Sequence, residues 1–124
     1  MDKNHKQRKL YKQRRQLSSR IKESIKMRSK FPSKVPVIME RYSNETALPL
    51  HDKTKFLIAE SITMSEFSSI IRQRMSLSSL QALYFMVNEN TLVRMSITFG
   101  ELYGIEKDED GFLYLTYASQ EVFG

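Results

Sequence analysis

The segment 112–117 constrains the fold of this 124-residue chain more than any other, because its alternate positions are apolar or aromatic on both faces. A strand of this kind has to be covered on both sides, so we expect it in the middle of a sheet. Residues 83–87 form a nearly continuous apolar run and predict a second buried strand. The rest of the chain therefore has to be arranged around the segment 112–117.

The first half of the chain predicts two strands and the main helix. Residues 35–42 are rich in β-branched side chains and predict the first strand. Pro36 is expected near the start of this strand or at an edge, because proline cannot donate a ladder hydrogen bond. Residues 55–59 predict the second strand. Thr63 and Glu66 match a capping box, so the main helix should begin after Thr63.

The second half adds a short helix and a turn. The helix is suggested by apolar residues that end near Gly104, namely Met95, Phe99, Leu102 and Tyr103. Residues 108–111, three acidic residues followed by a glycine, lack the ligand spacing of a calcium site and predict a turn before the last strand. This order of elements predicts an α+β chain with the ubiquitin-like β-grasp arrangement. A mixed four-stranded sheet is crossed by the main helix, and two N-terminal helices precede it.

The N-terminal region predicts a helical arm. Leu17, Ile21 and Ile25 recur every four positions, so they lie on one face of a helix, and we expect this face to make the arm's contacts. Phe31 precedes a proline, which pushes it out of the helical conformation and ends the helix. We therefore divide the chain into a basic helical arm, residues 1–31, and a body, residues 32–124, which form one folded unit.

Charge is distributed unevenly along the chain. Residues 1–34 carry 13 Lys and Arg against two acidic residues, a balance of +11, whereas residues 35–124 carry 7 against 12, a balance of −5. The arm should therefore attract acidic surfaces, phosphates or anionic lipid through forces that salt weakens. One function open to such a chain is to bind microtubules, RNA or an acidic membrane through the arm. The single tyrosine between residues 6 and 15 is too little for base stacking, so RNA contacts would be to phosphates.

Several classes of function lack their sequence signals. The chain has no cysteine, which excludes a disulfide framework, a thiolate nucleophile and a thiolate zinc site. His5 and His51 lie far apart, and a glycine-rich phosphate loop is absent. A secretory signal and an apolar run of the ~20 residues that a membrane span needs are also absent. We therefore expect a cytoplasmic protein that is not an enzyme and has no cofactor or metal.

Three separated segments resemble one family: FPSKVPVIMERY at 31–42, residues 48–57 ending in DKTKFL, and residues 107–124 with KDEDGFLY and YASQEVFG. They are similar, in order and at family-like spacing, to the autophagy modifiers of the microtubule-associated light-chain-3 and GABARAP type. The last segment is most similar to the light-chain-3 branch.

The resemblance implies a ubiquitin-like modifier. A family protease would process it, and activating and conjugating enzymes would attach it through Gly124 to phosphatidylethanolamine on autophagosomal membranes. Glycine suits this role because it has no side chain to obstruct acyl transfer. We expect a monomer that is cytoplasmic and moves to the autophagosome membrane when lipidated.

The resemblance also implies a peptide-binding site. Family members bind cargo receptors and adaptors that carry an aromatic-x-x-aliphatic motif, which adds a strand beside the second strand and inserts two anchors. The aromatic pocket would be lined by Glu23, Met27, Pro36, Ile38, Lys55, Leu57 and Phe112. The aliphatic pocket would be lined by Met39, Phe56, Ile58, Phe67, Ile70 and Ile71. Acidic residues that flank the motif would meet Arg14, Arg15, Lys34, Lys53 and Arg74.

Other interpretations of these residues stay open. Phe67, Ile70 and Ile71 have helical spacing, which is also the spacing of core residues. Lys53 and Lys55 lie on one face of a strand, where charges also discourage aggregation at a sheet edge.

Some positions depart from the family pattern. Leu83 and Tyr84 stand where the family usually has two phenylalanines, which affects packing or a second partner surface. Met39 and Phe67 replace smaller or branched residues in the aliphatic pocket, which affects its shape and the preference for partners.

Overall fold

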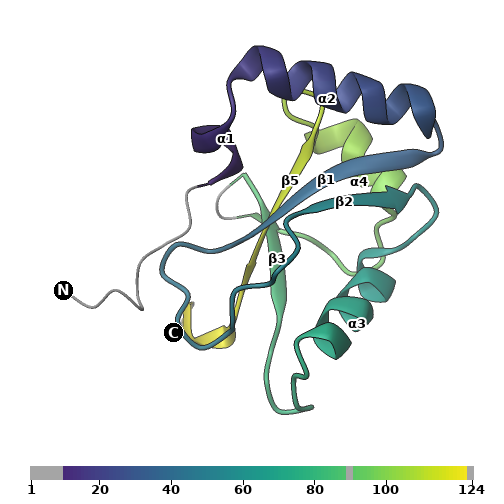
Figure 1. Ribbon diagram of the computed structural model, residues 1–124. Helices are drawn as coiled ribbons and strands as arrows, with labels where there is room; N and C mark the ends of the chain where they lie inside the picture. Colours follow the sequence, from purple (N-terminus) through teal and green to yellow (C-terminus); the bar gives the residue numbers. More distant parts are fainter. Residues whose placement is uncertain (1–9, 89–90, 123–124) are drawn as a thin grey trace.

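The computed structural model describes residues 10–88 and 91–122, and Figure 1 shows how the elements are arranged. The helices are α1 (Tyr11–Arg14), α2 (Leu17–Lys30), α3 (Met64–Arg74) and α4 (Phe99–Glu106), with a 3-10 turn, η2 (Gln120–Val122). The strands are β1 (Lys34–Arg41), β2 (Lys55–Ala59), β3 (Tyr84–Val87), β4 (Thr91–Leu92) and β5 (Leu113–Ala118). Within the described residues, no helix combines the length and the apolar character needed to cross a membrane.

The central strand of the sheet is β5, as its two apolar faces predict. The strand order is β2-β1-β5-β3-β4. The sheet is mixed because β1 and β5 run parallel, whereas the other neighbours run antiparallel. The predicted number of four strands is wrong, since β4 adds a fifth by pairing Thr91 with Val87 and Leu92 with Met86. Two exposed residues give no periodicity from which a strand is predicted.

Pro36 lies near the start of β1, as predicted. The N–H of Met39 donates to the carbonyl of Thr54 across 2.8 Å, so alternate residues of β1 bond towards β2 and the nitrogen of Pro36 faces β5. The parallel pairing with β5 begins only at Val37. The N–H that proline lacks therefore falls just before this ladder begins.

The main core lies between the sheet and the helices α3 and α4. Val37 of β1 and its neighbour Phe56 of β2 are both buried there. Rings from β2, α3, β3 and α4 meet around Phe67, whose ring centroid lies 5.1–5.6 Å from those of Phe56, Phe85 and Phe99. Such aromatic contacts make the α3 side the larger hydrophobic layer.

The opposite face of the sheet carries α1 and α2. Ile38, Phe112 and Tyr11 are buried together there, with Met27 of α2 and Tyr114 of β5 packed against them. Figure 1 shows α1 and α2 along this side of the sheet, away from α3. The arm therefore covers the second face of the sheet that the sequence required to be covered.

A capping box is present at the N-terminus of each helix of the main core, α3 and α4. The hydroxyl of Thr63 accepts the N–H of Glu66 at 3.1 Å, and the carboxylate of Glu66 accepts the N–H of Thr63 at 2.9 Å, as predicted. Thr98 and Glu101 form the same pair of bonds at the start of α4, at 3.2 and 3.0 Å. Thr98 and Glu101 also have the spacing of a capping box in the sequence, whereas the apolar residues alone predict a less exact start for this helix. α4 consequently begins after Met95 and continues two residues past Gly104.

The face by which α2 packs differs from the prediction. Arg20 and Ser24 are its buried residues, whereas Leu17 and Ile25 are 40% and 59% exposed. The prediction that residues 17, 21 and 25 form the packing face of this helix is therefore wrong. The reason is that α2 packs partly on the polar turn 108–111, where Arg20 and Ser24 bury hydrogen-bond donors. Met27, further along the helix, packs against the apolar cluster of Ile38 and Phe112.

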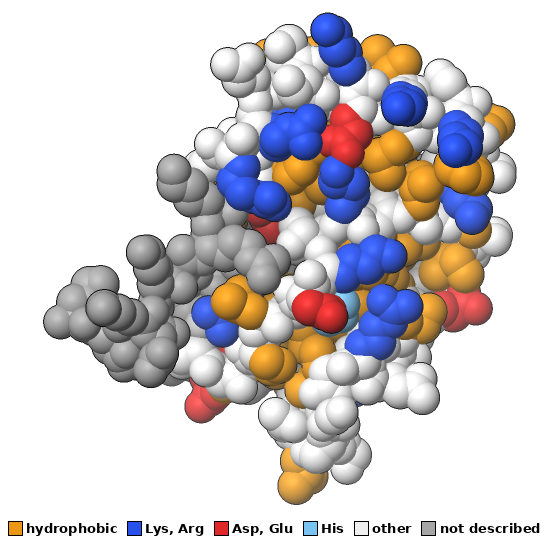
Figure 2. Space-filling model, in the orientation of Figure 1, with side chains coloured by type: hydrophobic (Ala, Val, Ile, Leu, Met, Phe, Trp, Pro, Cys, Tyr) orange, Lys and Arg blue, Asp and Glu red, His pale blue; other side chains and the backbone are white. Residues whose placement is uncertain are grey.

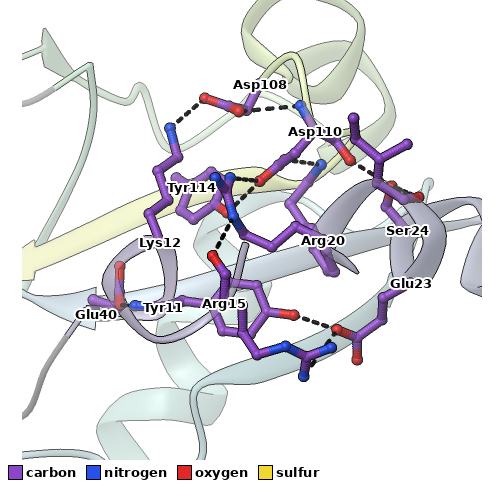
Figure 3. Close-up of polar contacts among 12 residues, drawn as sticks. Tyr11, Lys12, Arg15, Arg20, Glu23, Ser24, Glu40, Asp108, Asp110 and Tyr114 are labelled. Atoms are coloured by element: carbon purple, nitrogen blue, oxygen red, sulfur yellow. Dashed lines mark hydrogen bonds and ion pairs between the residues drawn. The ribbon is translucent and has the colours of Figure 1, made fainter. Parts of the chain in front are cut away.

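Asp110 is the centre of this contact (Figure 3). Its side chain is fully buried, and its Oδ2 lies 2.5 Å from both Nη1 of Arg20 and the hydroxyl of Tyr114. The hydroxyl of Ser24 donates to the Asp110 carbonyl at 2.5 Å. Gly111, with φ of +90°, completes the turn, and a Cβ there would lie 2.3 Å from the Ser24 oxygen. The arm and the body are thus joined by a buried polar cluster on both sides of the boundary at residue 31.

Candidate functional site

β2 is the outermost strand of the sheet, next to β1, and no strand of the described residues pairs with its outer side. We call this outer side the free edge of β2. Phe56 and Ile58 belong to the hydrogen-bonded pairs with β1, so the backbone groups of Lys55 and Leu57 face away from the sheet. Strand pairing also places side chains: Lys55 and Leu57 lie on the face of α2, and Phe56 and Ile58 lie on the face of α3. The edge therefore offers a backbone for strand addition, with one row of side chains on each side.

The structure brings the predicted aromatic-pocket residues together between β2 and α2. Pro36 lies beside Leu57 and Ile38 beside Lys55 across the two strands. Phe112 and Met27 belong to the same apolar cluster as Ile38. Glu23 reaches this surface from α2, where its carboxylate bonds the ammonium of Lys55. All seven residues of this set therefore border one surface.

Glu23 is held in place by three neighbours. Its Oε1 accepts the hydroxyl of Tyr11, and Nη1 of Arg15 lies 3.8 Å from the same oxygen (Figure 3). Its Oε2 accepts the ammonium of Lys55. Burial acts to raise the pKa of Glu23, but the bonds from Lys55 and Tyr11 outweigh it and keep this pKa below its usual range. Glu23 is therefore a fixed negative charge at the side of the aromatic surface.

Tyr11 is a residue of this surface that the sequence did not predict. It is only 2% exposed, and its ring meets that of Phe112 edge to face with centroids 5.5 Å apart. Burial, and then the bond to Glu23, raise the pKa of its hydroxyl. No signal marked it, because Leu10 is the only apolar residue near it and the pair has no periodic apolar partner.

A basic groove of about 510 Å³ runs along α2 beside the aromatic surface. It includes the predicted residues Glu23, Met27 and Arg15. Figure 2 shows Lys and Arg side chains gathered over α2, with hydrophobic side chains between them and the edge of β2. The groove also has lining residues that were not predicted: Ser19, Lys22, Lys26, Lys30 and Phe31. The spacing of four between the lysines was the signal that places them on one helix face.

The predicted aliphatic-pocket residues divide into two groups. Four are buried in the main core: Met39, Phe56, Phe67 and Ile71. Ile58 of β2 is partly buried against this core, and Ile70 of α3 is 44% exposed. The surface between β2 and α3 therefore has a core floor with Ile58 and Ile70 at its border.

Of the predicted cations for acidic flanks, Lys53 and Lys34 lie at the two ends of β2, Arg14 and Arg15 lie on the arm, and Arg74 lies on α3. Lys53 precedes β2 and stands over the ring of Phe56 at 4.8 Å, and Lys34 pairs with Ala59 at the other end of β2. Arg14 stands over the ring of Tyr11 at 5.5 Å, next to Arg15. Arg74 lies in the last turn of α3. Positive charge is thus present at both ends of the free edge.

His51 has a structural position in the loop that precedes β2. Its ring nitrogen Nδ1 accepts the backbone N–H of Lys53 at 3.1 Å. The backbone N–H of His51 donates to the hydroxyl of Tyr117 at 2.9 Å. In the part of the chain that the structure describes, no three His, Cys, Asp or Glu residues are grouped so as to hold a metal ion. Gly124, the predicted conjugation site, lies outside the described residues.

Comparison with known proteins agrees with this geometry. The chain matches the family described as "Autophagy protein Atg8 ubiquitin like" over residues 19–124. It is 54% identical to human microtubule-associated protein 1 light chain 3 gamma over 114 residues, which is 92% of this chain and 78% of that protein. It is 46% identical to protein lgg-2 of Caenorhabditis elegans over 114 residues, 92% and 88% of the two chains. It is 36% identical to autophagy-related protein 8a of Arabidopsis thaliana over 108 residues, 87% of each.

Among solved structures, the crystal structure of Trypanosoma brucei ATG8 superposes with a TM-score of 0.82 at 31% identity, covering 92% of this chain and 97% of that one. The fold is thus that of a ubiquitin-like protein with two added N-terminal helices. The chain belongs to the Atg8 family of ubiquitin-like autophagy modifiers. Membership does not favour the alternative in which the basic arm alone carries the function.

Proposed function

We propose that this protein is conjugated through Gly124 to phosphatidylethanolamine on autophagosomal membranes, where it recruits cargo receptors and adaptors that carry aromatic-x-x-aliphatic motifs. A family protease and activating and conjugating enzymes act on its tail, and it performs no catalysis itself. Before conjugation it is cytoplasmic and monomeric.

The free edge of β2 carries this proposal. A peptide that pairs with the outward backbone of Lys55 and Leu57 gains main-chain hydrogen bonds, and its alternate side chains then point to the two sides of the edge. An aromatic anchor would lie against Leu57 and Met27, beside the buried cluster that contains Ile38 and Phe112. An aliphatic anchor would rest between Ile58 and Ile70. Burial of these anchors supplies most of the affinity, whereas the cations at both ends of β2 speed association with acidic peptides.

A fluorescence titration tests the peptide site. The protein has no tryptophan, so a peptide with an acidic-Trp-x-x-Leu core supplies the indole signal. We expect a saturable blue shift of its emission on adding protein, and a loss of affinity of roughly tenfold for Leu57→Ala, as for an anchor residue at an interface centre. The matched control is Leu92→Ala, an exposed leucine on β4 at the other edge of the sheet.

The same titration has a clear contrary outcome. If the wild-type protein gives no shift at high concentration, or if Leu57→Ala and Leu92→Ala bind alike, the edge of β2 is not the peptide site. A peptide in which Trp is replaced by Ala shows whether the aromatic anchor is needed.

A conjugation assay tests the tail. Gly124→Ala should lose lipid attachment in a mixture of the family's activating and conjugating enzymes with phosphatidylethanolamine vesicles, because the added methyl group obstructs acyl transfer. The variant should still bind the tryptophan peptide. Equal lipidation of the variant and the wild type would show that the methyl group does not obstruct the transfer, and lipidation of a chain that lacks Gly124 would show that the tail is not conjugated through this glycine.

A further inference from the structure

A buried carboxylate holds the start of the C-terminal tail. Glu45, in the loop between β1 and β2, is 1% exposed. Its Oε1 accepts the backbone N–H and the hydroxyl of Ser119, at 2.6 and 2.9 Å. Its Oε2 accepts the N–H groups of Ala47 and Leu48, at 2.9 and 2.8 Å. One side chain thus ties its own loop to the residue that follows β5.

The four hydrogen bonds of Glu45 do more than close the loop between β1 and β2. Two of the four donors already fix the conformation of residues 45–48, which would close the loop without the tail. The other two come from Ser119, 74 positions away in the sequence. No Lys or Arg side chain in the described residues forms an ion pair with Glu45, so hydrogen bonds alone satisfy its carboxylate. Losing them would leave polar groups buried without partners, which makes the contact with Ser119 strongly specified.

Tyr84 makes a second contact one residue further along. Its hydroxyl donates to Oε1 of Gln120 at 2.7 Å. Tyr84 is one of the two positions where this sequence departs from the two phenylalanines usual in the family, and the hydroxyl is the group that a phenylalanine lacks. Figure 1 shows η2, which begins at Gln120, beside the loop between β1 and β2. The tail is therefore held at Ser119 from the loop and at Gln120 from β3.

We propose that Glu45 and Tyr84 are positioning residues for conjugation, because they fix the point at which the tail leaves the body. This inference rests on the proposed conjugation through Gly124. Gln120–Val122 form the turn η2, and Gly124 stands two positions beyond Val122 in the sequence, so the bonds at Ser119 and Gln120 lie within five positions of the conjugated residue. A tail whose start is already held has less conformational freedom to lose when it enters the narrow cleft of an activating enzyme. Less ordering is then needed on binding, which favours association.

The proposal is tested in the full-length chain with Glu45→Gln and Tyr84→Phe. Glutamine keeps the size of Glu45 but replaces one accepting oxygen with a donor group, so it cannot satisfy all four donors. Tyr84→Phe removes only a hydroxyl. The matched control is Tyr103→Phe, which removes a hydroxyl that donates to the carbonyl of Gly111 at 2.7 Å. Tyr103 lies on α4, and Figure 1 shows α4 and η2 at opposite ends of β5.

Three readouts separate positioning from folding: the KM and kcat of thioester formation with the activating enzyme, hydrogen exchange of the Ser119 amide, and affinity for the tryptophan peptide. We expect KM for Glu45→Gln to rise roughly three- to tenfold with kcat retained, as when a binding segment loses its preorganisation. Exchange at Ser119 should be faster, and peptide affinity should be unchanged. Tyr84→Phe should shift KM in the same direction by less, and Tyr103→Phe should not shift it.

The contrary outcomes are equally specific. A KM that stays constant, or falls, while Ser119 exchanges faster overturns the positioning role and leaves the contact a structural one. Unchanged exchange in Glu45→Gln shows that these bonds do not hold the tail. If the wild type forms no thioester, the proposed conjugation fails, and the exchange data still report the hold on Ser119. Should Glu45→Gln lower peptide affinity through misfolding, Tyr84→Phe and Ser119→Ala, which each remove one hydroxyl bond, decide the question.

Discussion

At the scale of single residues, stability depends on charges that the arm and the body share. Arg20→Ala would leave the buried carboxylate of Asp110 without its cation, with bonds from Tyr114 and the N–H of Phe112 remaining. Breaking a buried pair costs about 3 kcal/mol of unfolding free energy. Urea denaturation should show this loss, whereas Arg94→Ala, at an exposed residue, should change little. A loss below ~1 kcal/mol for Arg20→Ala would mean that the cluster is satisfied without the arginine.

Glu40 should give the stability of the protein an unusual pH dependence. Burial raises its pKa, and the N–H of Tyr11, which it accepts at 2.7 Å, lowers the pKa by less. The folded state therefore binds this proton more tightly than the unfolded state. Its contribution to stability is complete below the unfolded pKa of Glu40 and is lost as pH rises through the folded pKa.

Glu40→Gln removes this titration while keeping an acceptor for the N–H of Tyr11. At pH 7 the variant should unfold at a temperature equal to or above that of the wild type, and its advantage should vanish as the pH is lowered towards 4. Thermal unfolding by circular dichroism between these values measures both. The matched control is Glu66→Gln, at an exposed glutamate whose replacement keeps a side-chain acceptor for the capping box. An advantage that grows towards acid would show that burial does not dominate at Glu40.

Residues with local patterns were predicted well, and residues with distant partners were not. Thr63 and Glu66 form their capping box because the bonds span only three positions. Glu45 is bonded to Ser119, 74 positions away, and a lone glutamate in a polar loop gives no sign of this. Tyr11 and Asp110 are similar cases, because their burial depends on surfaces that exist only after folding.

At the scale of elements, α2 shows why an apolar period misleads. Its apolar positions 17 and 25 are exposed, whereas Arg20 and Ser24 are buried because they bond the polar turn 108–111. Its exposed side instead carries Lys22, Lys26 and Lys30 along the groove. The element was predicted, but the face by which it packs depends on the chemistry of its partner. β4 was not predicted at all, because its assignment depends on its pairing with β3 and not on a pattern of its own.

The lysines of α2 predict how ligand charge affects binding. Lys26→Glu should weaken a peptide with an acidic flank by roughly two- to fivefold at low salt, mainly through slower association, and the difference should shrink at high salt. Lys107→Glu, which changes charge equally but lies past the end of α4, is the matched control. Stopped-flow association of the tryptophan peptide gives the rates. An equal effect of both variants would indicate net charge, and not the groove, as the cause.

At the scale of the whole molecule, the arm behaves as a part of the fold. α2 shares the Asp110 cluster with the turn before β5, and Tyr11 fills the apolar space between Ile38 and Phe112. The division at residue 31 was made from charge and from the proline at position 32, and neither reports packing. Charge described the exposed surface of the arm correctly, whereas the contacts beneath it required the three-dimensional arrangement.

Deleting residues 1–12 tests how far the arm can be shortened. The positive charge of these residues suggests that the cut weakens binding to acidic partners, and the cut also removes Tyr11, which is 2% exposed. We expect the truncated chain to fold with an unfolding free energy lower by about 3 kcal/mol, the loss for removing a buried aromatic side chain. Tyr11→Ala in the full chain should lose a similar amount, and Tyr42→Phe serves as a mild control for a partly buried tyrosine. If the truncation is harmless while Tyr11→Ala is costly, the rest of the segment opposes folding; if both are harmless, Tyr11 is not part of the core.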